Sequence, residues 1–255
     1  MRRRPSFGSV HRSFQRTDHR PWDLPKAAWR WRQSWLDLLF AHFPVPAKKL
    51  QALVPDGVEV QEFDGTSWVG VVPFRMEGVT PRYLPDLPGL SAFPELNLRL
   101  YVEVGGRPGV WFVSLDAANA VAVWAARRFF HLPYFHATMS VKREGERIHY
   151  ACERKDSPVR FRGTYFPTSS AVETKPGTIE HFLTERYCLY TRHPDGALLR
   201  ADVHHLPWPL QLADADIEEN VIAGPQGIEL EGPPALLHFA RRLDVVVWNV
   251  ERVRP

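Results

Sequence analysis

Cysteine is scarce in this chain of 255 residues, which contains only Cys152 and Cys188. The two lie far apart in sequence and form no C-x-x-C pair, so we predict neither a disulfide framework nor a cysteine-based zinc site. No apolar run approaches the roughly 18 residues that a membrane-spanning helix needs. The basic start is not followed by the apolar segment of a signal peptide. A cytoplasmic protein without a membrane partner is therefore expected.

Several motifs that carry chemistry are also missing. The chain has no glycine-rich phosphate loop of the Rossmann or Walker type and no G-x-S-x-G serine motif. His204 and His205 are adjacent, so on a strand their side chains point to opposite faces and do not share one ion. His181 and Glu185 are four residues apart but lack an H-E-x-x-H pattern. We predict no cofactor and no metal site.

Positive charge is concentrated at the start of the chain. The formal net charge is +3, and residues 1–20 contain six arginines against Asp18 alone, a local balance of +5. The rest of the chain is therefore −2, which gives no indication of a nucleic-acid partner. We expect residues 1–25 to form a flexible basic tail and residues 26–255 to form one domain. Contact of the tail with an acidic surface is the alternative, and residues 1–20 are expected to be dispensable for folding.

Turn signals recur along the chain at regular intervals. Four glycine-containing pairs, Asp64-Gly65, Gly105-Gly106, Glu144-Gly145 and Asp195-Gly196, each separate two strand-like runs. Glycine provides the positive φ that tight hairpins require. The chain is therefore predicted to be α+β and mainly antiparallel β.

Residues 95–104 show the clearest strand pattern. Leucine and valine occupy every second position from Leu96 to Val104, and mostly polar residues take the positions between them. Residues 109–115 carry apolar groups on both faces, so that strand is expected to be central in the sheet.

Helices are expected at three places, and a fourth segment is ambiguous. An alanine-rich, almost entirely apolar segment at 117–130 indicates a buried helix with Asp116 as its N-cap. Shorter helices are predicted at 46–53 and at 177–185. Residues 29–43 are ambiguous, because their first half could open a helix while their second half resembles a strand.

The polar face of residues 95–104 is the first candidate site. If this face lines a cavity, Glu95 could act as an acid or base and Arg99 could hold a carboxylate. Asn97 and Tyr101 share that face and are candidate ligand-binding residues. A strand whose polar face meets solvent is the alternative.

Residues 131–136 are the second candidate. Tyr134 and His136 are two residues apart and would share one face of an extended segment. Because histidine titrates near neutral pH, His136 is a candidate acid or base. His131 and Tyr134 are candidate ligand-binding residues. Histidines that only pack in the core are the alternative.

Taken in order, several stretches together are similar to one protein family. They are residues 31–43 with Gln33, Trp35 and His42, residues 64–74, residues 93–102, residues 109–116, residues 185–190 and residues 204–210. On these stretches the chain resembles the uncharacterised YqjF-like family, over roughly residues 29–250. That family is similar in fold to acetoacetate decarboxylase, whose antiparallel sheet curls into a cone around a buried site. The resemblance therefore implies a cone-like sheet and favours a strand at residues 34–43.

The resemblance also extends to part of the segments that form the decarboxylase site. Phe93-Pro-Glu95 is similar to the segment that bears a site glutamate, which implies that the polar face of residues 95–104 points inward. Ser114 to Asp116 with the following helix are similar to the elements before the reactive loop of the decarboxylase. That loop has two adjacent lysines, one of which forms a Schiff base. Here residues 127–134 contain no lysine, and arginine cannot form the imine.

Three function classes remain open. The first is an enzyme that acts on a small organic acid without Schiff-base chemistry. The second is a protein that binds a small ligand in the same cavity without reaction. The third is a structural or interaction module. The expected partner is a small molecule, an organic acid above all.

Overall fold

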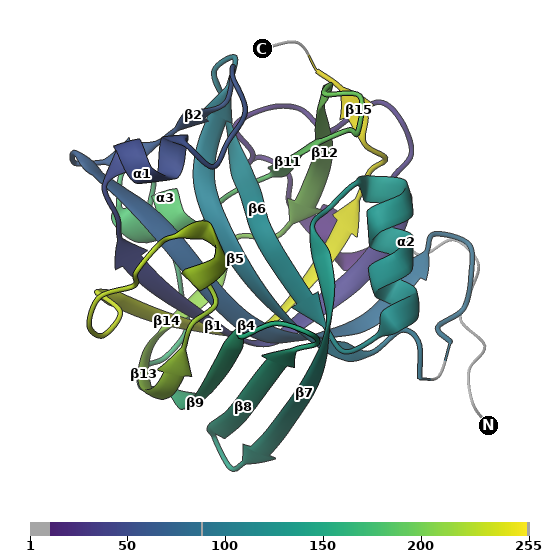
Figure 1. Cartoon of the computed structure of the whole chain (residues 1–255). Coiled ribbons are helices and arrows are strands. Elements are labelled where there is room, and N and C mark those ends of the chain that lie inside the picture. Colours follow the sequence, from purple (N-terminus) through teal and green to yellow (C-terminus); the bar gives the residue numbers. More distant parts are fainter. Residues whose placement is uncertain (1–10, 88, 254–255) are drawn as a thin grey trace, which may run out of the picture.

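The structure, a computed structural model, describes residues 11–87 and 89–253 (Figure 1). Within these residues it contains fifteen strands, three α-helices and two short 3-10 helices. The strands are β1 (Trp31–Pro44), β2 (Glu59–Val60), β3 (Glu62–Phe63), β4 (Thr66–Pro81), β5 (Phe93–Val104), β6 (Arg107–Ala117), β7 (Tyr134–Glu144), β8 (Arg147–Arg154), β9 (Arg160–Pro167), β10 (Val172–Glu173), β11 (Cys188–Arg192), β12 (Leu198–His205), β13 (Pro209–Asn220), β14 (Leu236–Val247) and β15 (Glu251–Arg252). The helices are α1 (Ala47–Gln51), α2 (Ala120–Phe130), α3 (Ile179–Thr184), η1 (Arg12–Gln15) and η2 (Gly224–Gln226).

Antiparallel pairing dominates, as the sequence predicts. The four glycine-containing turns join β3 to β4, β5 to β6, β7 to β8 and β11 to β12, and all four pairs are antiparallel. Gly65, Gly145 and Gly196 have φ of +74°, +61° and +94°. A side chain would be strained at these φ values, which is why glycine occupies these turns.

The sheet closes on itself twice among the described strands. One ring runs through β5, β6, β11, β12, β14, β1 and β4 and returns to β5. A second ring leaves β6 through β7, β8, β9 and β13 and rejoins β14. In Figure 1 the hairpin of β7 and β8 extends away from the first ring, below its strands. The curled sheet predicted from the resemblance is confirmed, and its two rings share a wall of β14, β1, β4, β5 and β6.

The shared wall explains the alternating pattern of β5. Leu96, Leu98 and Leu100 are fully buried in an apolar core together with residues of β8 and β9. Glu95 and Arg99 point to the other face, which belongs to the first ring. Because side chains of a strand alternate between faces, one strand lines two interiors.

The short helices and the first strand agree with part of the sequence-based expectations. Helices α1 and α3 lie within the predicted ranges 46–53 and 177–185. The ambiguous residues 29–43 form no helix, because the long strand β1 begins at Trp31 and pairs with both β4 and β14. No helix in the described part of the chain is long and apolar enough to cross a membrane.

Helix α2 differs from its prediction in two respects. It begins at Ala120 and is capped by Asn119, whose side chain accepts hydrogen bonds from two backbone N–H groups. Asp116 is instead the penultimate residue of β6, so it cannot cap a helix. The helix is also not buried all round, because Trp124 is 61% exposed and Val121 and Phe129 are exposed as well. Figure 1 shows α2 standing on the outside of the strands, so only its inner face is covered.

Residues 11–25 do not form the flexible tail that composition predicts. Phe14 stacks on His204 with ring centroids 5.1 Å apart. The Arg20 guanidinium is buried, donates to the backbone oxygen of Val203 at 2.6 Å and lies 3.7 Å from the Asp202 carboxylate. Aromatic packing and a buried ion pair hold this segment on β12, which composition does not reveal. Residues 1–10 of the predicted tail lie outside the described residues.

Candidate functional site

A pocket of about 170 Å³ lies inside the first ring of strands. Water needs about 10–15 Å³ by a comparable measure, so the pocket has room for on the order of ten heavy atoms. Its walls are side chains of the seven ring strands, and the inner face of α2 closes one side. Most of the lining is apolar. The aromatic part of it consists of Trp31, Trp35, Phe74, Phe93, Phe112, Phe130, Tyr134 and Trp208.

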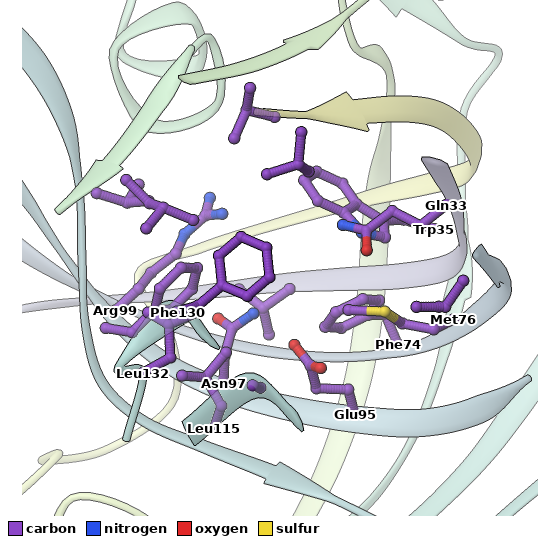
Figure 2. Close-up of a pocket in the computed structure, with 18 of the residues that line it drawn as sticks. Gln33, Trp35, Phe74, Met76, Glu95, Asn97, Arg99, Leu115, Phe130 and Leu132 are labelled. Carbon is purple, nitrogen blue, oxygen red and sulfur yellow. The ribbon is translucent and has the colours of Figure 1, made fainter. Parts of the chain in front are cut away.

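Strand β5 supplies three polar lining residues, Glu95, Asn97 and Arg99. Figure 2 shows the Glu95 carboxyl and the Asn97 amide projecting from this strand into the same space. The Oδ1 atom of Asn97 is buried and has no hydrogen-bond partner among the described residues. Tyr101 continues the row but lies behind the lining, where its hydroxyl contacts Arg99.

Glu95 is buried, with 1% of its surface exposed. Its carboxyl group accepts a hydrogen bond of 2.7 Å from the Tyr134 hydroxyl. Burial raises the pKa of Glu95 to about 8, the Tyr134 hydrogen bond opposes this, and the Asp116 carboxylate adds to it. At neutral pH Glu95 is therefore mostly an uncharged carboxylic acid. Tyr134, a predicted ligand-binding residue, is thus the hydrogen-bond partner of Glu95.

Arg99 is held without any carboxylate. Its Nε donates to the Tyr101 hydroxyl at 3.0 Å, and one terminal nitrogen donates to the backbone oxygen of Leu183 at 3.0 Å. The guanidinium lies 5.0 Å from the ring centroid of Phe40. Tyr101 is held in turn by His42, whose Nε2 lies 2.5 Å from the tyrosine oxygen. These contacts fix the guanidinium in position but leave its charge unpaired.

Arg186 lies near Arg99 and also lines the pocket. It comes from the connection between α3 and β11, donates to the backbone oxygen of Phe182 at 2.7 Å, and donates to the side-chain oxygen of Gln61. Burial lowers the pKa of Arg186 to about 10, and the charge of Arg99 contributes to the same effect. Neither arginine forms an ion pair with a carboxylate of residues 11–87 or 89–253. Glu103 accepts a hydrogen bond from Gln61, which in turn accepts one from Arg186, and the Glu103 charge raises the pKa of Arg186 slightly against the effect of burial.

Arg186 was missed by the sequence analysis. It follows α3 in a stretch without period-two alternation, so no pattern marks it as interior. One feature of the sequence could have indicated it, because Arg186 lies in residues 185–190, one of the stretches that resemble the YqjF-like family. Gln33, Thr184 and His205 also line the pocket and were not predicted.

The predicted histidines are not in the pocket. His136 is exposed, in a depression on the other side of α2 that is also lined by Val123 and Arg127. Helix α2 therefore separates His136 from Glu95, although Ala117 of β6 pairs with both residues in the sheet. A sequence shows which residues share a strand face but not which helix later covers it.

His131 is displaced for a local reason. It ends α2 in the left-handed conformation, with φ of +53°, and its ring packs 4.5 Å from the ring of His193. This turn carries the chain from the helix back to β7, so that Leu132 and Tyr134 line the pocket and His131 does not.

The lysines of the chain lie away from the pocket. All six lysines of the chain are exposed, and none lines the pocket. Lys48 and Lys49, the one adjacent pair, lie on α1 as predicted. Across residues 11–87 and 89–253, no group of three or more histidine, cysteine, aspartate or glutamate side chains is placed to hold a metal ion.

Comparison with known structures identifies the same fold. A solved structure of the enduracididine biosynthesis enzyme MppR complexed with pyruvate matches with a TM-score of 0.60 at 12% identity, over 88% of this chain and 90% of that one. The acetoacetate decarboxylase of Legionella pneumophila matches with a TM-score of 0.58 at 14% identity, over 98% of both chains. At such low identity these matches establish the acetoacetate decarboxylase-like fold alone.

Comparison with sequences gives a closer relationship. Residues 32–244 match the DUF2071 family, which is described as an uncharacterized conserved protein. The uncharacterized protein YqjF of Bacillus subtilis (strain 168) is 43% identical over 230 residues, which covers 90% of this chain and 95% of YqjF. The chain thus belongs to the DUF2071 family and is a YqjF-like protein on an acetoacetate decarboxylase-like fold.

Proposed function

We propose that the pocket binds a small organic acid, that Arg99 and Arg186 bind its carboxylate, and that Glu95 acts on it as an acid. One observation carries this proposal. Two buried guanidinium groups meet at the pocket, each 8% exposed, and neither has a carboxylate partner among the described residues.

Unpaired buried charges of this kind are costly. Removing a charge from water costs several kcal/mol unless an opposite charge and hydrogen bonds compensate. A ligand carboxylate fits the need, because a guanidinium fork binds two carboxylate oxygens at once. Two positive charges in the pocket lining would also disfavour a cationic ligand near them.

The Glu95 side chain can supply a proton in such a complex. Its proton-bearing form predominates below pH 8. In a reaction step, the O–H bond of Glu95 would break as the proton passes to a basic oxygen of the ligand. The resulting carboxylate would keep its hydrogen bond from Tyr134. Turnover that depends on this step should fall as the pH rises above about 8.

Two structural neighbours support the ligand class. MppR has been solved with pyruvate and with a condensation product of pyruvate bound. Those complexes concern another protein, and the exposed positions of all lysines here argue against an imine in this one. A cytoplasmic location and the absence of a nucleic-acid partner remain parts of the proposal.

The test is isothermal titration of the protein with small carboxylates, each paired with its uncharged methyl ester. The acids should bind and the esters should bind at least ten-fold more weakly, since a charged hydrogen bond contributes about 1.5–3 kcal/mol. Arg99→Gln and Arg186→Gln should each weaken the acids selectively. Arg147→Gln is the control, because this arginine is exposed on the hairpin of β7 and β8. Equal affinity for acids and esters would contradict the proposal.

A further inference from the structure

We infer that the ligand is an elongated acid with three parts: a carboxylate at Arg99 and Arg186, an apolar body, and an uncharged hydrogen-bonding group at Glu95. This inference rests on the proposed function and specifies its ligand class. It follows from the distance between Glu95 and Arg99 and from the apolar residues that line the pocket.

Glu95 and Arg99 stand four residues apart on β5. At about 3.3 Å per residue, their Cα atoms are roughly 13 Å apart along the strand. In Figure 2 the ring of Phe130 lies between the Arg99 guanidinium and the Glu95 carboxyl. A ligand as short as acetate would contact one end only and leave the other end unused.

The space between the two ends is apolar. Leu115 lies opposite Asn97 in the sheet, Phe112, Phe130 and Leu132 also line the pocket, and Ala126 of α2 adds only a small side chain. Asn97 is the polar lining residue of β5 between the two ends. A hydrocarbon body suits this lining, since each buried methylene adds about 0.8 kcal/mol, or about four-fold in affinity.

The Glu95 end selects against charge. Within the described residues, Tyr134 is the hydrogen-bond partner of the Glu95 carboxyl, and no lysine or arginine forms an ion pair with it. An uncharged carboxylic acid both donates and accepts, so it matches a hydroxyl or a carbonyl oxygen. An ammonium group would lose its hydration there and meet an acid that is mostly neutral.

The test is a titration of wild-type protein with straight-chain acids from acetate to decanoate. Affinity should rise about four-fold for each added methylene until the chain fills the pocket, and then stop rising. At the length of best fit, the ω-hydroxy acid should bind more tightly than the unsubstituted acid, and the ω-amino acid more weakly. Glu95→Leu, which removes the hydrogen-bonding group and keeps similar volume, should abolish the preference for the hydroxyl.

A second variant tests the apolar body without touching either polar end. Ala126→Leu should weaken the long acids at least ten-fold and weaken acetate much less. Affinity that does not depend on chain length, or a preference for the ω-amino acid, would overturn the inference while leaving carboxylate binding intact. If no acid of any length binds, the proposed function itself fails.

Discussion

Glu95 shows how a single residue can link the stability of this fold to pH. The unfolded chain releases the Glu95 proton near the ordinary value of 4.5, whereas the folded protein keeps it up to a pKa of about 8. Between these two values the folded state binds more protons than the unfolded state. Stability therefore falls as the pH rises through this window.

Replacing Glu95 with glutamine removes this loss. Between pH 4.5 and pH 8 only the folded state keeps the Glu95 proton, and each pH unit above 4.5 lowers the free energy of unfolding by about 1.36 kcal/mol. Wild-type Glu95 therefore lowers this free energy by about 3 kcal/mol at pH 7 and by about 1 kcal/mol at pH 5. Glu95→Gln should therefore raise the thermal midpoint by several degrees at pH 7 and by much less at pH 5. Calorimetry at both pH values measures the difference. The exposed Glu153→Gln should show no such trend, and a Glu95→Gln midpoint that falls at pH 7 would show that the buried carboxylate is ionised and paired.

Tyr101 positions Arg99 from behind the pocket lining. Its hydroxyl accepts from Arg99 Nε and contacts His42, and Gly70 leaves space for it, since a Cβ there would lie 2.9 Å from the tyrosine oxygen. Tyr101→Phe should weaken carboxylate binding about three- to ten-fold, because one hydrogen bond contributes about 1 kcal/mol. Isothermal titration checks this.

Tyr165→Phe is the matched control for that experiment. Tyr165 is equally buried, and its hydroxyl donates to the backbone oxygen of Asp37 at 2.8 Å, in the other core. This variant should lose a similar amount of stability but keep full affinity. If both variants lose affinity alike, the effect of Tyr101 is structural and not positional.

At the scale of elements, β5 was predictable and α2 was not. The period-two pattern of β5 follows from strand geometry alone, and it correctly separates Leu96, Leu98 and Leu100 from Glu95 and Arg99. Helix α2 is apolar on both its covered and its exposed side, with Trp124 facing outward. Composition therefore suggests full burial, and only the tertiary arrangement shows which side is covered.

The segment of residues 11–22 should contribute to stability, against the expectation from its composition. Its removal would expose the apolar surface of β12 and leave the buried Asp202 without Arg20 and without the hydrogen bond from Trp22. Deletion of residues 1–22 should lower the thermal midpoint by about 10 °C, since about 3–5 kcal/mol is lost and each kcal/mol shifts the midpoint by about 2–4 °C in a chain of this size. Differential scanning calorimetry of the deletion and of Arg20→Gln checks this, and an unchanged midpoint in both would contradict it.

At the scale of the whole molecule, the pocket depends on contacts between distant parts of the sequence. Arg99 from β5 and Arg186 from the connection before β11 are 87 positions apart, and closure of the first ring brings them together. Likewise Glu95 meets Tyr134 across β6. The local pattern correctly predicted that Glu95, Asn97 and Arg99 share one face of a strand. No local pattern could show that Arg186 lines the pocket or that His136 lies outside it.

The positions of the lysines over the whole molecule bear on whether the protein can form a Schiff base with a carbonyl compound. All six lysines are exposed and none lines the pocket, so none is placed to form an imine with a ligand bound there. We predict no stoichiometric adduct after incubation with acetoacetate and reduction with borohydride, measured by mass spectrometry of the intact protein. An adduct on any lysine would refute this, and peptide mapping would locate it.

Binding of an organic acid by Arg99 and Arg186 is tested most directly by a crystal structure of the protein with its tightest-binding straight-chain acid. We predict that the acid occupies the pocket inside the first ring, with carboxylate oxygens about 2.7–2.9 Å from guanidinium nitrogens of both Arg99 and Arg186. Its chain should run past Phe130 toward Glu95. An acid bound outside the ring, or bound in the pocket with its carboxylate turned away from both arginines, would contradict it.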